Sequence, residues 1–267
     1  MPLDESRTPQ VQGTQTLDRS VLILNAIAEH GEQGADIETL IQVTGLSRAT
    51  LYRLLKSLKC HGFVRAPQRG GYRLGYALLS LGAQAGNDGG IRELSRPALM
   101  RLAERFGERF FLFVEDGYHA LCLELQEGCH RTSSFTRGVG GRVLFGVGQA
   151  SVALLAHLPT GQRERILNQN APRLAREYCI ELGPLNDAIK AVRRDGYTAG
   201  VLDQCLSAYT GVAVALLDPQ GHPLGALSCA LPNVRMTDRY RMTLAKAMHA
   251  EATLIVQRAL DPQRFIR

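Results

Sequence analysis

The sequence lacks the short patterns that mark the common classes of enzyme. It contains no phosphate-binding G-x-x-x-x-G-K-[ST], no G-x-S-x-G elbow and no zinc-binding H-E-x-x-H. The stretch GVGQAS at 146–151 misses the dinucleotide motif G-x-G-x-x-G at its third glycine and lacks a strand–helix–strand context. Catalysis needs a nucleophile or an acid–base pair held together. Since no pattern indicates one, we predict no catalytic residues, and an enzyme is the disfavoured alternative.

Closely spaced metal ligands are absent too. None of the six cysteines forms a C-x-x-C pair, and the seven histidines do not cluster. Metal sites need closer spacing, so we predict no metal and no cofactor. Most of the cysteines lie in apolar stretches such as ALCLEL and ALSCAL, which indicates small buried thiols in a reducing compartment.

Long hydrophobic runs are missing as well. No apolar run reaches the roughly 18 residues that a membrane helix needs, and the polar start MPLDESRTPQVQG lacks the apolar region of a signal peptide. We therefore expect a soluble cytoplasmic protein without membrane contact. The chain has 267 residues, 45% of them hydrophobic and 21% charged, which is enough for two domains with a core each.

Acidic residues are absent from one stretch in which basic ones gather. Residues 1–46 hold seven acidic and two basic side chains, whereas residues 47–74 hold seven basic side chains and no acidic one. A local block without carboxylates is typical of a surface that binds phosphates. Because basic solvated faces are common, the block alone leaves that interpretation open.

The same stretch has the pattern of a winged helix-turn-helix. Apolar spacing and capping residues predict helices at about 16–30, 36–44 and 47–61, with Gly45 ending the second and Ser47 capping the third. Two short strands at 63–66 and 71–74 follow as a hairpin. In this motif the N-terminal end of the second helix of the pair reaches base edges in the major groove.

A helical wheel separates the buried and exposed faces of the helix that begins after Ser47. Leucines at 51, 54, 55 and 58 mark the buried face. The candidate DNA-binding residues are Ser47, Arg48, Ala49, Thr50, Tyr52, Arg53 and Lys56, with Arg69 in the turn of the hairpin.

Arg48 has the clearest chemical reason to bind DNA. Arginine bonds guanine O6 and N7 in a bidentate manner, and the hydroxyl of Thr50 donates or accepts. A cation at a helix N-terminus costs about 0.3–1 kcal/mol, so an external anion is the expected reason for Arg48. Its exposure and that of Arg53, without acidic neighbours, favour DNA contact. Lys59 lies near the helix C-terminus, where a cation is favoured on structural grounds alone.

The remainder of the chain has the pattern of an α+β domain behind a helical linker. Helices are predicted at 76–85 and 91–106 around the linker sequence GNDGG, then strands at FFLFVED and ALCLELQ, with HRTSSFTRG as a third candidate. Helices at about 149–158, 184–195 and 237–260 and strands at 212–218 and 224–230 complete a mainly antiparallel sheet with helices packed on it. The predicted division is a disordered tail at 1–14, a DNA-binding domain at 15–75, linker helices at 76–107 and a second domain at 108–262.

Several of these stretches together resemble one known family. They are LDRSVLILNAIAEHG, IETLIQVTGLSRATLYRLLKSLKCHGFVR, GGYRLGYALLSLG, VGGRVLFGVGQASVALLA, DGYTAG and GVAVALLDPQGHPLGALSCALP. Over about residues 15–262 the chain is similar to the isocitrate lyase regulator (IclR) family. The resemblance implies an N-terminal winged helix-turn-helix, a helical linker and a C-terminal GAF-like α+β effector-binding domain. It also implies homodimers, or dimers of dimers (homotetramers), on palindromic double-stranded operator DNA.

The resemblance places an effector pocket on the sheet, beneath the helix that follows VGGRV. The implied effector-binding residues are Val143, Phe145, Ala150, Ser151, Val201, Asp203, Tyr209, Gly211, Ser228 and Ala230. Departures from the family pattern make this pocket less polar, which favours an aromatic or mostly apolar small organic effector over a small keto acid. Ser228 or Arg142 is expected to hold its polar group. For Phe145 and Val201, ordinary core packing is an equal alternative.

Together these features predict a sequence-specific DNA-binding transcription regulator, repressor or activator, under the control of a small-molecule effector. A protein that uses its winged helix to bind another protein is the second alternative. Salt dependence distinguishes the two, because DNA binding through arginine and lysine weakens steeply as salt rises.

Overall fold

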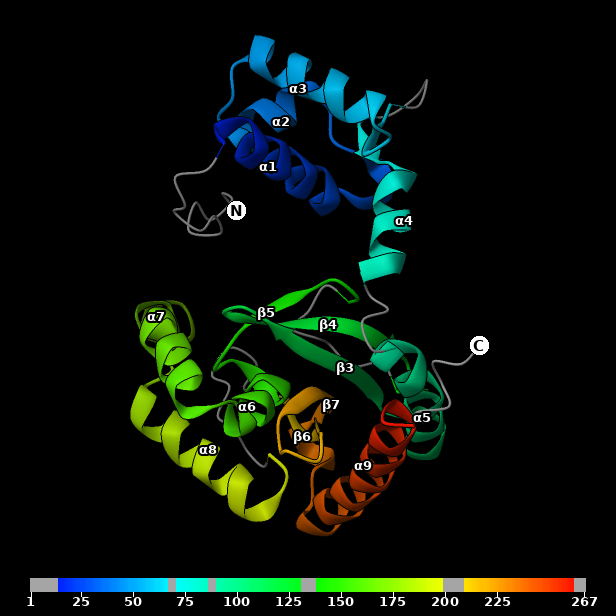
Figure 1. Cartoon of the computed structure of the whole chain (residues 1–267), viewed down its shortest axis with the longest axis vertical. Helices are drawn as coiled ribbons and strands as arrows, with labels where there is room; N and C mark the ends of the chain where they lie inside the picture. Colours follow the sequence, from blue (N-terminus) through cyan, green and yellow to red (C-terminus); the bar gives the residue numbers. More distant parts are fainter. Residues whose placement is uncertain (1–13, 67–70, 86–89, 131–137, 199–208, 262–267) are drawn as a thin grey trace. The chain divides into compact units, whose positions relative to one another are not determined.

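The chain forms two compact units, which are described separately. The computed structural model describes residues 14–66, 71–85, 90–130, 138–198 and 209–261, and it divides the chain into Met1–Ala85 and Gly86–Arg267 (Figure 1). The predicted tail at 1–14 lies outside the described residues except for Thr14, which is at the N-cap position of the first helix. Among the described residues, no helix is long and apolar enough to cross a membrane.

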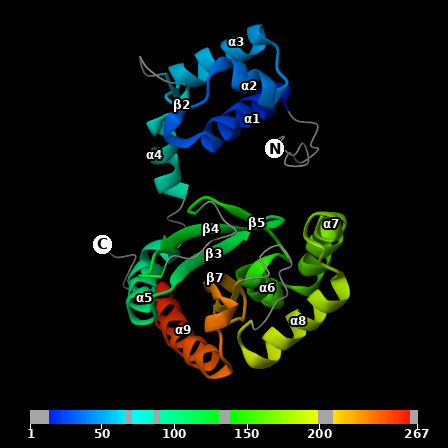
Figure 2. The same cartoon turned by 180° about the vertical axis from the view of Figure 1, so that it is seen from behind.

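The first unit has the predicted order of three helices, a hairpin and a fourth helix (Figure 2). Its elements are α1 (Gln15–Glu29), the short 3-10 helix η2 (Gly31–Gln33), α2 (Ile37–Thr44), α3 (Arg48–Cys60), β1 (Val64–Arg65), β2 (Arg73–Leu74) and α4 (Tyr76–Ala85). β1 and β2 pair antiparallel and are shorter than predicted. The turn between them, at 67–70, lies outside the described residues.

Local capping interactions explain the sharp turn between α2 and α3. The Asp36 carboxylate accepts a hydrogen bond from the backbone N–H of Thr39 at 2.7 Å, which begins α2. Gly45, with φ of 66°, ends it in the left-handed region. Ser47 then caps α3 through the backbone N–H of Thr50. Buried Ile23, Leu40 and Leu51 join the three helices in one core, so the position of α3 is determined by capping and packing together.

The second unit is an antiparallel sheet with helices on both faces. Its elements are α5 (Ile91–Phe106), β3 (Arg109–Asp116), β4 (His119–Gln126), β5 (Arg142–Leu144), α6 (Gly148–His157), α7 (Thr160–Tyr178), α8 (Leu182–Asp195), β6 (Tyr209–Leu217), β7 (Pro223–Pro232), the 3-10 helix η5 (Asn233–Arg235) and α9 (Asp238–Ala259). The strand order is β5-β4-β3-β7-β6, and each neighbouring pair is antiparallel.

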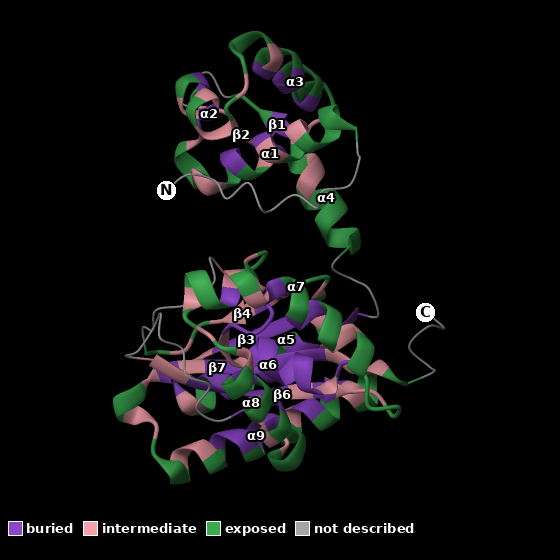
Figure 3. Ribbon diagram, turned by 90° about the vertical axis from the view of Figure 1, so that its left-hand side faces the viewer, coloured by how far each residue is buried: buried purple, intermediate pink, exposed green. Residues whose placement is uncertain are grey.

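Alternating side chains along the strands divide the core of this unit into two layers. Ala213 packs in the layer with α6, α7 and α8, whereas its neighbours Val212 and Val214 pack in the layer with α5 and α9. α6 is buried from Ala150 to Ala156 (Figure 3), which agrees with a helix that is apolar nearly all round. The predicted α+β architecture is confirmed.

The structure assigns α5 to the second unit and not to a linker. The chain divides after Ala85, and Leu99, Leu102 and Ala103 of α5 are buried in the layer that α5 shares with α9. The sequence prediction of a linker that extends to residue 107 therefore differs from the structure. The physical reason is that the apolar stripe of α5 needs a partner, and the sheet supplies it.

The sequence did not predict α7 or β5, nor the short 3-10 helices η2 and η5. α7 has a narrow buried stripe of Ile166, Leu167, Asn170 and Leu174, one of them polar, and Pro172 lies within the helix, so its apolar periodicity is weak. β5 has only three residues, which hydrogen-bond to β4 after two glycines. Of the candidate strand HRTSSFTRG, residues 131–137 lie outside the described residues.

Candidate nucleic-acid interface and effector site

The predicted DNA-binding residues lie together on the exposed side of α3. The four leucines are buried, whereas Ser47, Arg48, Ala49, Tyr52, Arg53 and Lys56 are exposed and Thr50 is half-buried. We call these seven residues the α3 surface. Arg69 lies outside the described residues. The exposed positions agree with those of the helical wheel, because the leucine spacing determines which side of α3 faces the core.

Arg48 has an acidic partner, which sequence reasoning missed. Its Nη2 donates to Oε1 of Glu38 at 2.7 Å, and the two side chains are 58% and 62% exposed. The hydrogen bond and charge of Glu38 raise the pKa of Arg48, with a smaller contribution from Tyr52. The interpretation that Arg48 lacks acidic neighbours is therefore wrong. Glu38 precedes Arg48 by ten residues, and the turn between α2 and α3 brings the two together.

The other basic residues near α3 differ in their partners. Arg65 donates to the backbone carbonyl of Leu74 at 3.2 Å and lies over the ring of Tyr76 at 5.2 Å, so it stabilises the hairpin and α4. In the described part of the chain, no ion pair involves Arg53 or Lys56. Because Glu38 balances the charge of Arg48, Arg53 and Lys56 supply the unpaired positive charge of the α3 surface.

The predicted effector residues on β5, β6 and β7 lie on the sheet face covered by α6. β6 contributes Tyr209 and Gly211, and β7 contributes Ser228 and Ala230, with Gly211 directly opposite Ala230. A Cβ on Gly211 would lie 3.1 Å from Cγ of Gln149, which shows that the first turn of α6 passes closely over β6. Val143 is on β5, at the opposite edge of the sheet.

Hydrogen bonds distinguish the polar candidates in this set. The Ser151 hydroxyl donates to the backbone carbonyls of Val147 at 2.7 Å and Gly148 at 3.1 Å, so it holds the turn that begins α6. Arg142 forms an ion pair with Asp116. Ser228 is buried, at 7% exposure, and the side-chain hydrogen bonds of the described residues include none to its hydroxyl. Of the side chains of Ser151, Arg142 and Ser228, only that of Ser228 is without a partner among the described residues.

The remaining predicted residues are apolar or not described. Phe145 is completely buried in the α6 layer, and Ala150 is buried in the same layer. The backbone carbonyl of Phe145 accepts a hydrogen bond from Nδ2 of Asn170 on α7, so Phe145 contributes to the core. Val201 and Asp203 lie outside the described residues.

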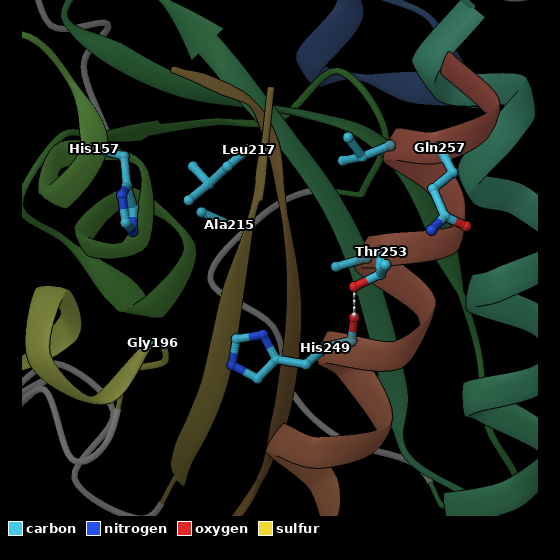
Figure 4. A pocket seen from close by; sticks show the side chains of 9 residues that line it. His157, Gly196, Ala215, Leu217, His249, Thr253 and Gln257 are labelled. Atoms are coloured by element: carbon cyan, nitrogen blue, oxygen red, sulfur yellow. Dashed lines mark hydrogen bonds between the residues drawn. The ribbon is translucent and has the colours of Figure 1, made fainter. Parts of the chain in front are cut away.

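A groove lies elsewhere on the second unit, along the edge of β6 (Figure 4). Its volume is about 310 Å³, and its lining includes His157, Ala215, Leu217 and His249. Burial lowers the pKa of both histidines, and the charge of Arg193 lowers that of His157 further. The lining includes none of the predicted effector residues, so this groove is separate from the face under α6.

The first unit is a winged helix-turn-helix with a basic exposed helix, and the second is an α+β domain covered by helices. Together they define a DNA-binding transcription regulator with a separate effector domain. The chain belongs to the IclR family. The model of the IclR helix-turn-helix domain matches residues 16–67, and the model of the bacterial transcriptional regulator IclR C-terminal domain matches residues 84–257. This is a family of transcriptional regulators and not of enzymes, and the predicted family, fold class and general function are confirmed.

Individual proteins are similar over most of the chain. The acetate operon repressor of Salmonella typhimurium is 28% identical over 249 residues, 91% of this chain and 89% of that protein. The regulator KipR of Bacillus subtilis is 25% identical over 155 residues, 58% of this chain and 61% of KipR. The structure of an IclR homologue from Microbacterium hydrocarbonoxydans, solved with 4-hydroxybenzoate, superposes with a TM-score of 0.76 at 23% identity, covering 91% of this chain and 98% of that one.

Proposed function

We propose that the α3 surface, with Arg69, reads operator DNA in the cytoplasm and that a small molecule on the α6 face controls this binding. The observation that carries the proposal is the division of α3: its leucines are buried, and Arg48, Arg53 and Lys56 point outward. Arginine at the N-terminal end of such a helix reads guanine, and further cations contact phosphates.

A mobility-shift titration on the DNA upstream of the protein's own gene tests DNA binding. Affinity is expected to fall steeply from low to physiological salt, with a logarithmic slope of about −0.9 for each phosphate neutralised. Binding of the duplex that is insensitive to salt, or equal for unrelated duplexes, would contradict a sequence-specific DNA reader. Reporter transcription with and without the regulator then distinguishes repression from activation.

We infer that the effector is aromatic or otherwise mostly apolar, with one polar group that contacts Ser228. The α6 layer contains Phe111, Phe145 and several alanines, and the Ser228 hydroxyl there has no hydrogen-bond partner among the residues that the structure describes. The Microbacterium homologue in complex with 4-hydroxybenzoate gives the same ligand class for that protein. A thermal-shift screen tests the inference: aromatic monocarboxylates are expected to stabilise the protein, and selective stabilisation by small dicarboxylates would contradict it.

The exposed apolar side chains of α4 support assembly as a homodimer or a dimer of dimers. Tyr76, Leu79 and Leu81 are 72%, 71% and 57% exposed, and no residue of α4 is buried. An apolar helix without a buried face is typical of an interaction site. The effector is then expected to favour one arrangement of the dimer and so to change the spacing of the two α3 helices.

A further inference from the structure

Glu38 is an acidic residue at the edge of the α3 surface. It lies in the first turn of α2, and its carboxylate accepts a hydrogen bond from Nη2 of Arg48. We propose that Glu38 determines the sequence specificity of DNA binding by keeping Arg48 paired until the correct base pair is offered. This inference rests on the proposed function and concerns a residue that contacts Arg48 and not the bases.

The position of the pair is determined by the capped ends of two helices. Asp36 caps α2 and Ser47 caps α3, and the Ser47 hydroxyl also donates to the Thr50 hydroxyl at 3.0 Å. Glu38 and Arg48 are therefore held close together by anchored backbone. Both side chains remain largely in water, so the pair opens at small cost.

The two kinds of DNA site offer Arg48 different replacements for Glu38. On a random sequence, the only replacement for the carboxylate is a phosphate, and the freed Glu38 would face the negatively charged duplex, so Arg48 stays paired with Glu38. At the correct base pair, Arg48 gains two hydrogen bonds to guanine O6 and N7. Since the second exchange compensates for the exposed carboxylate and the first does not, Glu38 weakens binding to random DNA more than binding to the operator.

The Glu38→Gln variant tests this separation, with Glu32→Gln as the matched control. Glu32 is exposed on η2 of the same unit and has no ion pair with a described residue. Wild type and both variants are used, as full-length protein, to enrich sequences from a random-duplex library. Affinities for the enriched duplex and for a random 30-base-pair duplex are then measured over a salt series.

We expect Glu38→Gln to bind the random duplex about three- to tenfold more tightly and the enriched duplex with little gain. Its salt slope on the random duplex should steepen by about 0.9, because Arg48 is free to neutralise one more phosphate. The enriched motif should lose preference at the base pairs that also lose it in Arg48→Ala. Glu32→Gln should retain the specificity ratio and the motif of the wild type.

Two results would overturn the proposal. One is an unchanged ratio of enriched to random affinity in Glu38→Gln, and the other is an equal change in Glu32→Gln, which would reflect overall charge alone. The double variant Glu38→Gln/Arg48→Ala tests whether Glu38 acts through Arg48. If it does, the double variant should lose no more specificity than Arg48→Ala. If the wild type enriches no sequence at all, the proposed function itself is wrong, and the inference with it.

Discussion

Arg48 carries a positive charge at the end of α3 where the helix dipole disfavours it. Sequence reasoning attributed this to an external anion, whereas the structure shows that Glu38 supplies part of the compensation. An ion pair exposed to water is weak, whereas a bidentate contact to guanine contributes about 1–3 kcal/mol to base discrimination. The pair with Glu38 is therefore compatible with Arg48 as a base reader.

Replacing Arg48 with alanine is expected to remove specific binding. The loss of a bidentate contact lowers operator affinity by about tenfold or more, whereas affinity for random DNA falls less. Lys59→Ala is the control on the same helix, because Lys59 lies in the last turn. Mobility shifts on both duplexes measure the ratio. Intact operator binding by Arg48→Ala would show that the protein does not recognise the operator through this residue.

His157 gives the second unit an acid-sensitive contribution to stability. Burial, and then the charge of Arg193, lower the pKa of His157 in the folded state, so the folded unit favours the neutral ring. The unfolded chain takes up the proton near pH 6.5. The contribution is therefore complete above about pH 6.5 and is lost as pH falls towards the lowered pKa.

The His157→Gln variant should flatten this part of the pH dependence. Thermal unfolding from pH 7.5 to 5 measures it, and the wild type should lose more stability on acidification than the variant. His249→Gln is expected to act in the same direction, because burial also lowers the pKa of His249. Parallel loss in the wild type and both variants would show that neither ring matters to the fold.

At the scale of the elements, one buried side chain connects α7 to the sheet. Nδ2 of Asn170 donates to the backbone carbonyl of Tyr118 at 2.9 Å and to that of Phe145 at 3.2 Å. The first carbonyl lies in the turn between β3 and β4, and the second follows β5. Asn170 therefore anchors the helix that sequence periodicity did not predict.

Asn170→Asp is expected to destabilise the second unit by at least about 2 kcal/mol. A carboxylate of nearly the same shape cannot donate to two carbonyls and is itself buried without a partner. Denaturant unfolding measures the change. Asn168→Asp, on the exposed side of α7, controls for the charge and is expected to alter stability by less than about 0.5 kcal/mol. Equal effects of the two variants would contradict an anchoring role.

α4 is the element from which assembly is most directly tested. Leu79→Glu places a charge at an apolar position that is 71% exposed in the single chain, so it should weaken a dimer without harming the monomer fold. Sedimentation velocity over a concentration series measures the shift towards monomer. Gln84→Glu adds the same charge at another exposed position of α4 and should leave the assembly unchanged.

At the scale of the whole molecule, each of the two units has its own core, and the α3 surface and α6 face belong to different units. Separate cores predict two unfolding transitions in calorimetry. Operator DNA should raise the transition of the first unit, by about 2.7 kcal/mol of added stability at 100 times Kd. The Arg48→Ala variant should lose this shift. One transition shared by both units would contradict independent cores.

The sequence by itself determined the elements whose signals are local. Capping residues, glycines in left-handed turns and leucine spacing act over a few residues, so α2, α3, α4, α6 and α9 were predicted to within about two residues of their ends. The exposed face of α3 followed from the same periodicity. The family resemblance then supplied the candidate effector-binding positions on the sheet.

Only the tertiary structure decided what depends on segments far apart in the chain. Glu38 contacts Arg48 because a turn brings two helices together. α7 is held in place because Asn170 and three apolar residues pack against the rest of the second unit. α5 belongs to the second core because it packs with α9 and the sheet. The Ser151 hydroxyl likewise donates within the turn that begins α6, so Ser228 is the serine on the α6 face that we propose as the effector's polar contact. These outcomes depend on long-range packing and pairing, which spacing along the chain does not encode.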